Sequence, residues 1–141
     1  SSDVCSSDLN QRWPLEDGSV GVIRAHDALE HLKDPAHVMK EAFRVLKPMG
    51  WLLSLTPSTD GRGAFQDPTH ISFWNSNSFW YYTRAETARY INTPVRFQSV
   101  RVKNFFPNKY CEEHKIVNVK ADLLRLPDID SGIRVPGAVE I

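Results

Sequence analysis

The first clearly patterned part of the chain is a short apolar run that follows a turn. Val20, Val22 and Ile23 are β-branched, and Gly18 stands just before them. β-Branched side chains fit a pleated surface, and glycine commonly marks the start of such a segment. The pattern therefore predicts a buried strand over residues 19–26.

An amphipathic helix is predicted next. Asp34 offers a side-chain acceptor at the N-cap, and Pro35 takes the first helical position, where its missing N–H costs nothing. Apolar side chains then recur at three- and four-residue spacing, at Val38, Met39, Ala42, Phe43, Val45 and Leu46. Residues 47–50 are expected to end this helix and lead into a strand over residues 51–56. Strand, helix and strand joined by short turns imply a right-handed crossover between parallel strands.

The rest of the chain is predicted to close the sheet after a long loop. Residues 57–75 show no clear period and lie at the carboxyl end of a strand, where open α/β sheets bind ligands. A short helix is expected after Asn75, and Thr83-x-x-Glu86 predicts a capping box that opens a second helix. The last two predicted strands are residues 95–102 and 116–124.

Composition narrows the class of protein. The 141 residues are 41% hydrophobic and 24% charged, which is ordinary for one globular domain. Seventeen basic residues balance seventeen acidic ones, so a nucleic-acid partner is not expected. No apolar run approaches the ~20 residues that span a bilayer, so no membrane partner is expected either. Cys5 and Cys111 do not make a disulfide framework, which fits a reducing, cytoplasmic location.

Several motifs resemble the second half of a class I S-adenosylmethionine-dependent methyltransferase. The segment His26-Asp27-Ala28-Leu29-Glu30-His31 resembles the D-x-L-E-H element that follows a strand in that family. The segment Arg44-Val45-Leu46-Lys47-Pro48-Met49-Gly50 resembles the R-V-L-K-P-G-G end of a helix, and Thr56-Pro57 resembles the end of the next strand. The resemblance implies an α/β, Rossmann-like three-layer sheet. Because the sequence contains no G-x-G-x-G run, we expect an incomplete sheet that lacks the N-terminal strands and the glycine-rich cofactor loop.

The resemblance also suggests domain limits. Residues 10–126 are expected to form a partial methyltransferase domain. Residues 1–9 show no periodicity, resemble translated sequencing-adapter sequence, and are interpreted as a non-native leader. Residues 127–141 are polar and are expected to form a C-terminal tail. Met49 stands where the family usually has glycine, which is tolerable if its φ angle is negative.

The same resemblance implies the positions of the ligands. His26, Asp27 and Ala28 are expected to flank the methionine portion of S-adenosylmethionine. Asp27, Glu30 and His31 also have the spacing of the E-x-x-E-H metal element of ubiquinone-pathway and small-RNA O-methyltransferases. This implies a Mg²⁺ ion that lowers the pKa of the acceptor. The alternative is that Glu30 and His31 are hydrogen-bonding groups at the start of a helix.

His70 is the candidate general base. It lies in Asp67-Pro68-Thr69-His70-Ile71-Ser72-Phe73-Trp74, which resembles an H-x-x-F-aromatic element on the acceptor side of the family's pocket. Histidine changes charge near neutral pH without perturbation, which suits proton transfer. The alternative is that His70 only bonds the loop to the sheet. Six aromatic residues within residues 73–82 are interpreted either as an acceptor pocket or as core covering the sheet.

Methyl transfer to an unidentified small or medium-sized acceptor is the function that the resemblance implies. The chain alone is expected to be an inactive fragment, and its oligomeric state is not indicated. The alternative is a non-catalytic interaction module derived from a methyltransferase half-domain, because an uncovered sheet edge favours pairing with another chain. An NAD-dependent oxidoreductase on a similar sheet is weaker, since the E-H and K-P-x-G elements are not its signatures.

Overall fold

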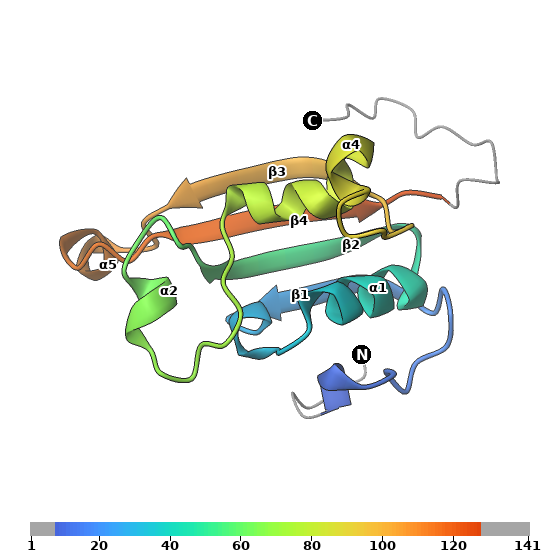
Figure 1. Cartoon of the computed structure of the whole chain (residues 1–141), viewed down its shortest axis with the longest axis horizontal. Coiled ribbons are helices and arrows are strands. Elements are labelled where there is room, and N and C mark those ends of the chain that lie inside the picture. Colours follow the sequence, from blue (N-terminus) through green and yellow to red (C-terminus); the bar gives the residue numbers. More distant parts are fainter. Residues whose placement is uncertain (1–7, 128–141) are drawn as a thin grey trace.

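The computed structural model of the protein describes residues 8–127 and contains one four-stranded mixed sheet (Figure 1). The strand order is β1-β2-β4-β3, so the last strand of the chain lies between the second and the third. β1 and β2 are parallel, whereas β4 runs antiparallel to both of its neighbours. The strands are β1 (Val20–His26), β2 (Leu46–Pro57), β3 (Phe97–Phe105) and β4 (Asn118–Arg125). The α/β fold class and all four predicted strands are therefore confirmed.

The helices are short, apart from the one between the two parallel strands. They are η1 (Asp8–Asn10), η2 (Leu29–His31), α1 (Pro35–Val45), α2 (Gly63–Gln66), η3 (Ser76–Phe79), α3 (Trp80–Thr83), α4 (Ala85–Ala88) and α5 (Lys109–Glu113). The predicted start of α1 is confirmed, because the Asp34 side chain accepts a 3.1 Å hydrogen bond from the backbone N–H of His37. α2 interrupts the predicted long loop, and α5 was not predicted. Within residues 8–127, no helix is long and apolar enough to cross a membrane.

Two predictions concern residues outside the described part of the chain. The expected tail begins at residue 127, and residues 128–141 are not described. The expected leader covers residues 1–9, of which only Asp8 and Leu9 are described, and Leu9 packs against the core. Cys5 is likewise outside, whereas Cys111 is a free, half-buried thiol.

One apolar core lies between the sheet and the helices α1 and α3, which cover the same face of the sheet in Figure 1. Met39 of α1, Leu52 of β2 and Phe79 beside α3 are all essentially buried. Among the six clustered aromatic residues, Trp74, Phe79 and Tyr82 belong to this core, whereas Phe73 and Tyr81 remain exposed. The interpretation of the cluster as core is thus confirmed for three of them.

β1 is not the buried strand that its apolar residues predict. Each of its residues is at least partly exposed, and Val22 is 53% exposed. The reason is topological: β1 lies at the edge of the sheet and pairs only with β2 among the described residues. An apolar run identifies a strand but does not distinguish the edge of a sheet from its centre.

The predicted capping box at Thr83 is also wrong. Thr83 is the last residue of α3, and its hydroxyl donates a 3.0 Å hydrogen bond back to the carbonyl of Phe79. The N-cap of α4 is Arg84, whose side chain makes no capping hydrogen bond. A Thr hydroxyl inside a helix commonly bonds the carbonyl four residues earlier, and this contact took the place of the cap.

The junction between α1 and β2 is tighter than predicted. β2 begins at Leu46, directly after α1, but its pairing with β1 passes from Leu46 to Trp51, so residues 47–50 form a bulge where the turn was predicted. Gly50 is required there, because a Cβ atom would lie 2.9 Å from the carbonyl oxygens of Gly21 and Lys47. Met49 adopts a φ angle of 70°, so the condition under which a side chain is tolerable there, a negative φ, is not met. A side chain in this left-handed region strains the backbone.

Replacing Met49 by glycine is therefore expected to stabilise the protein. Removing the left-handed strain of a non-glycine residue raises the free energy of unfolding by roughly 1–2 kcal/mol. The greater entropy of glycine in the unfolded chain offsets part of this gain. We expect a net gain of about 0.5–1 kcal/mol in urea unfolding. Gly18→Ala is the control, because Gly18 has a φ of 59° and open space around its Cβ position, so only the backbone is strained. A Met49→Gly variant no more stable than the parent would contradict the strain.

Arg44 ties the end of α1 to the segment that leads into β1. Its guanidinium donates to both carboxylate oxygens of Glu41, to Asp17, and to the carbonyls of Leu15 and Trp13, over distances of 2.7–3.1 Å. Glu41 also accepts a 2.8 Å hydrogen bond from the backbone N–H of Trp13. The hydrogen bond from Arg44 holds the pKa of Glu41 below its usual value.

Candidate functional site

The carboxyl end of β1 turns sharply through Asp27. Asp27 has a φ angle of 51°, and its backbone N–H donates a 2.8 Å hydrogen bond to the carbonyl of Leu55 on β2. Aspartate tolerates this left-handed conformation better than most residues, which explains an acidic residue at the turn. The side chains of His26 and Asp27 are exposed to solvent, whereas Ala28 is half-buried.

Glu30 is a buried carboxylate at the start of the segment that follows. It lies in η2, and its side chain is only 3% exposed. One carboxylate oxygen accepts a 2.7 Å hydrogen bond from the hydroxyl of Thr56 near the end of β2. Its backbone carbonyl accepts hydrogen bonds from the N–H groups of Ile71 and Ser72, at 2.9 and 3.1 Å. Glu30 thus joins η2 to β2 and to the loop that carries His70.

His31 and His70 meet at this junction. Their rings pack edge to face with centroids 5.1 Å apart. Nδ1 of His31 lies 3.2 Å from the carbonyl of Thr69, and Nδ1 of His70 lies 3.1 Å from the carbonyl of Ala64. The His70 side chain is 7% exposed, whereas the His31 side chain is 37% exposed. Ala64 lies in α2, inside the 57–75 segment, so this bond holds the loop to itself and is not the bond from the loop to the sheet that the alternative predicted.

Asp67 lies on the outer side of His70. One of its carboxylate oxygens is 3.5 Å from Nε2 of His70, and the other accepts hydrogen bonds from the backbone N–H and the hydroxyl of Thr69. The bonds from Thr69 hold the pKa of Asp67 below its usual value, so this carboxylate stays charged at neutral pH.

The three ligand atoms offered by Glu30, His31 and His70 lie within 4.8 Å of one another. This group differs from the expected set of Asp27, Glu30 and His31, because His70 is present in it and Asp27 is not. The spacing of Asp27, Glu30 and His31 cannot reveal His70, which is distant in sequence. The fold of the 57–75 loop brings His70 to this group. Thr56, which anchors Glu30, was likewise missed, although it is part of the strand-end Thr-Pro pair.

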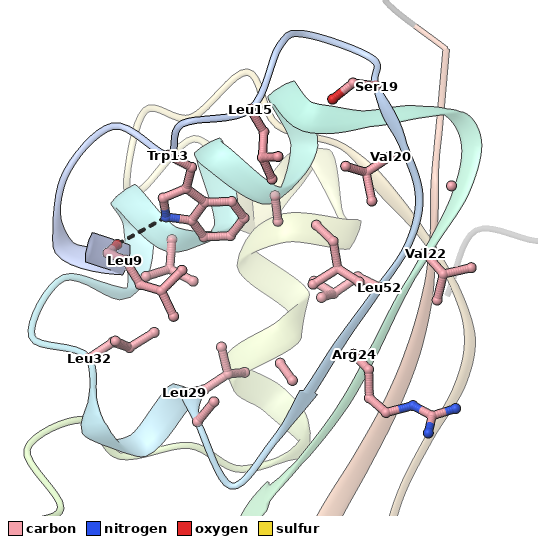
Figure 2. A pocket seen from close by; sticks show the side chains of 16 residues that line it. Leu9, Trp13, Leu15, Ser19, Val20, Val22, Arg24, Leu29, Leu32 and Leu52 are labelled. Atoms are coloured by element: carbon pink, nitrogen blue, oxygen red, sulfur yellow. Dashed lines mark hydrogen bonds between the residues drawn. The ribbon is translucent and has the colours of Figure 1, made fainter. Parts of the chain in front are cut away.

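A groove of about 970 Å³ runs along the free edge of β1 (Figure 2). Its walls are mostly apolar, with Trp13 and Leu32 on one side and Val20 on the strand. The indole N–H of Trp13 donates to the carbonyl of Leu9 at 3.1 Å, while the guanidinium of Arg24 points away from the other labelled side chains. Ala28 lines the same groove, so the turn at Asp27 lies at its end.

The opposite face of the sheet carries a row of half-buried apolar residues. Along β2, Leu52 and Thr56 point into the core, whereas Trp51, Leu53 and Leu55 alternate with them. The last three lie beside the exposed β1 residues Val22, Arg24 and His26. Among the described helices, α1 and α3 lie on the other face (Figure 1). This face therefore offers apolar surface for packing.

Part of the chain is similar in sequence to known methyltransferase domains. Residues 2–54 match the family model described as a methyltransferase domain. A probable S-adenosylmethionine-dependent methyltransferase of Mycolicibacterium smegmatis is 41% identical over 67 residues, which are 45% of this chain. The chain spans about a quarter (26%) of the length of that relative.

Solved structures share the fold. A putative methyltransferase of Bacillus halodurans superposes with a TM-score of 0.57 at 16% identity, over 85% of this chain and 76% of that one. The cyclase SpnF gives a TM-score of 0.58 at 16% identity, over 89% of this chain and 55% of that one. These matches confirm the resemblance to class I methyltransferases and the Rossmann-like fold, and the incomplete sheet fits a partial domain.

Proposed function

We propose that this chain supplies the acceptor-side half of an S-adenosylmethionine-dependent methyltransferase. The observation that carries the proposal is the turn at Asp27, which places an exposed carboxylate at the carboxyl end of a parallel strand and at the end of the β1 groove. Ligands of open α/β sheets bind at such strand ends. The match of residues 2–54 to the methyltransferase-domain model supports the same assignment.

The described residues fit one wall of a cofactor site. S-adenosylmethionine carries an ammonium group and a sulfonium, and the exposed Asp27 carboxylate has the charge to meet either. His26 and Ala28 flank Asp27, and Ala28 lines the groove, which supports a role for these three residues beside the methionine portion. The apolar edge and the bare sheet face are the surfaces that the other half of such a domain would cover. We propose that the remaining contacts, including the backbone cradle, come from that half.

The cofactor would supply a methyl group on a sulfonium, which is displaced in line by the acceptor. The chain's own contribution is to align the acceptor and remove its proton. A backbone carbonyl can only accept, so Nδ1 of His70 carries the proton and Nε2 keeps its lone pair. Asp67 then stabilises the imidazolium that forms when Nε2 accepts a proton. The exposed, stacked rings of Phe65 and Phe73 lie close to His70 in sequence and give an apolar surface for an acceptor.

The expected Mg²⁺ does not fit the group of side chains that the fold brings together. Mg²⁺ takes oxygen ligands in near-octahedral geometry. The group of Glu30, His31 and His70 offers one carboxylate and two imidazoles. No step of the proposed reaction is therefore assigned to Mg²⁺.

Calorimetric titration of S-adenosylmethionine tests the proposal. Residues 1–141 alone are expected to bind it with a dissociation constant no tighter than about 1 mM, whereas the whole reading frame should bind it at micromolar concentration. In the whole protein, Asp27→Asn keeps the turn and removes the charge, so affinity should fall about tenfold. Glu112→Gln on the exposed helix α5 is the matched control.

Two results would overturn the proposal. Micromolar binding by residues 1–141 alone would show that no second half is needed. Absence of binding by the whole folded protein would favour the second candidate, a non-catalytic interaction module that pairs through the apolar edge of β1.

A further inference from the structure

Three exposed apolar side chains lie on both sides of His70 in the sequence. Phe65 is 61% exposed, Ile71 is 54% exposed and Phe73 is 50% exposed. Single apolar side chains are ordinary on a protein surface, whereas a group of them commonly marks a binding surface. We call these three residues the apolar strip.

The apolar strip is fixed by its neighbours. The rings of Phe65 and Phe73 stack, with centroids 5.3 Å apart and 23° between their planes. Ser72 and Trp74 are buried on either side of Phe73, and the indole N–H of Trp74 donates a 2.8 Å hydrogen bond to the Ser72 hydroxyl. The backbone N–H of Ile71 bonds to η2 at 2.9 Å. The two rings are therefore ordered before a ligand arrives, which lowers the entropy cost of binding.

The apolar strip lies at the end of the sheet where ligands are expected. Phe65 belongs to α2, which lies in Figure 1 at the end where β1 and β2 finish. Nδ1 of His70 is 3.1 Å from the carbonyl of Ala64, the residue before Phe65, so the candidate base is tied to the first ring. Open α/β sheets bind their ligands at this end. A ligand on the strip is thus close to His70.

The size of the apolar strip favours a small molecule over a protein partner. Three half-exposed side chains of this kind offer on the order of 300 Å² of surface. Each partner of a stable dimer buries roughly 800 Å², so a second copy of the chain would gain too little here. A flat aromatic ring suits the strip better than an aliphatic chain, because it can extend the stack of Phe65 and Phe73.

His70 and Asp67 face each other with atoms that accept protons. Because Nδ1 of His70 donates to the carbonyl of Ala64, Nε2 keeps its lone pair. Nε2 lies 3.5 Å from a carboxylate oxygen of Asp67, whose side chain is 45% exposed. Hydrogen bonds from Thr69 hold the pKa of Asp67 below its usual value, so its carboxylate is charged at neutral pH. Two acceptors this close suit a ligand with several N–H donors and a positive charge.

We propose that the apolar strip, His70 and Asp67 bind an arylalkyl amine as the methyl acceptor. This inference names the substrate class of the proposed methyl transfer and therefore rests on that proposed function. The aromatic ring stacks on the strip, and the ammonium donates to Nε2 of His70 and to the Asp67 carboxylate. Two bonds of about 2.9 Å to one nitrogen place their acceptors roughly 4–5 Å apart. Asp67 must therefore turn outward by about 1 Å, which its exposed side chain allows.

The same contacts select an amine over other acceptors. A carboxylate on the ligand would be repelled by Asp67, and the nearest lysine or arginine in the sequence is Arg62, at the N-cap of α2. A neutral hydroxyl would gain less from the negative charge than an ammonium does. The geometry therefore favours methylation of nitrogen.

The transfer balances with these groups. The ammonium passes one proton to Nε2 of His70, which leaves a lone pair on the amine nitrogen. The nitrogen–methyl bond then forms as the methyl–sulfur bond of the sulfonium breaks, which gives a methylated ammonium and a neutral thioether. Asp67 stabilises the imidazolium until its proton passes to water.

Equilibrium binding of three matched probes to residues 1–141, followed by NMR without S-adenosylmethionine, tests the site. 2-Phenylethylamine is expected to bind with a dissociation constant of about 1 mM. 3-Phenylpropionate, which replaces the ammonium by a carboxylate, should bind at least about tenfold more weakly. 2-Cyclohexylethylamine, which keeps the charge but lacks a flat ring, should bind at least about threefold more weakly.

Variants separate the stacking from the charge. Phe65→Leu and Phe73→Leu keep the apolar bulk but remove a ring, and each should weaken binding of 2-phenylethylamine about threefold to tenfold. Asp67→Asn should weaken the amine about tenfold and leave 3-phenylpropionate no weaker, a change of preference that a merely structural role would not cause. Tyr90→Leu is the control, because Tyr90 is 71% exposed and follows α4 at the other end of the sheet (Figure 1).

Four results would overturn the inference. They are absence of amine binding, equal binding of 3-phenylpropionate, unchanged binding by both folded leucine variants of the strip, and loss of amine binding in the whole reading frame, where the other half would then cover the strip. Sedimentation that shows residues 1–141 to dimerise through the strip would also overturn it. Absence of S-adenosylmethionine binding by the whole protein is a separate result, which contradicts the proposed function and leaves the amine-binding site standing.

Discussion

Replacing Arg44 by methionine is expected to lower the free energy of unfolding by about 3 kcal/mol. The Arg44 side chain is 15% exposed and that of Glu41 is 7% exposed, so the pair is largely shielded from water. Methionine keeps much of the aliphatic bulk but leaves the Glu41 carboxylate without its cation and the Trp13 and Leu15 carbonyls without a donor. Urea unfolding followed by tryptophan fluorescence measures the loss.

Arg24→Met is the matched control, because it is the same substitution at an exposed position on β1. We expect a change within about 0.5 kcal/mol there. Equal effects of the two substitutions would contradict the role of the Arg44 contacts.

The same pair predicts a dependence of stability on pH. Because Arg44 lowers the pKa of Glu41 in the folded state below the 4.5 of the unfolded chain, the pair stabilises the fold above pH 4.5. This contribution is lost as the pH falls below 4.5 through the folded-state pKa of Glu41. The Arg44→Met variant should therefore lose less stability than the parent on acidification from pH 6 to pH 3.

A second large effect is expected for Gly61→Ala. A Cβ atom at Gly61 would lie 2.6 Å from both the carbonyl oxygen of Lys115 and the backbone nitrogen of Val117. Backbone atoms cannot rotate away, so the loop must separate from the start of β4, at a cost of about 2–3 kcal/mol. Thermal unfolding measures the loss.

Gly21→Ala is its control. Gly21 lies in β1, and nothing stands within 4 Å of its Cβ position. We expect its stability to change by less than about 0.5 kcal/mol. A Gly61→Ala variant as stable as Gly21→Ala would show that the loop yields without cost.

Local patterns in the sequence predicted the central strand–helix–strand unit well. Asp34 and Pro35 fix the start of α1 through contacts within one turn, so the sequence is sufficient there. The exposure of β1 depends on which strands flank it, and the strained φ of Met49 depends on how closely β1 and β2 pair. Neither can be read from neighbouring residues. Arg44 had no predicted role, since its partners at residues 13–17 are distant in sequence.

Some residues of the candidate site could likewise be predicted from local sequence, and others could not. Glu30 and His31 were found because they are adjacent in one motif, and the structure places them together. His70 was identified as a candidate base, but its proximity to both depends on the turns within the 57–75 loop. Thr56 matters through its hydrogen bond to Glu30, and Asp67 through its charge 3.5 Å from Nε2 of His70. Thr56 is distant from Glu30 in sequence, so no spacing rule links these two residues. The roles of His26, Asp27 and Ala28 in cofactor binding stay predictions.

The central position of β4 also has a consequence for synthesis on the ribosome. The edge of β2 that faces away from β1 pairs with β4, the last described strand to be synthesised. Trp51 pairs with Leu124, and Pro57 pairs with Asn118. Until β4 has emerged, that edge of β2 and the whole inner edge of β3 have no hydrogen-bonding partner. Pairings so distant along the chain form slowly and expose strand edges while they wait. The nascent chain thus passes through an interval, ended only by residues 118–125, in which β1 is the only described strand that pairs with β2.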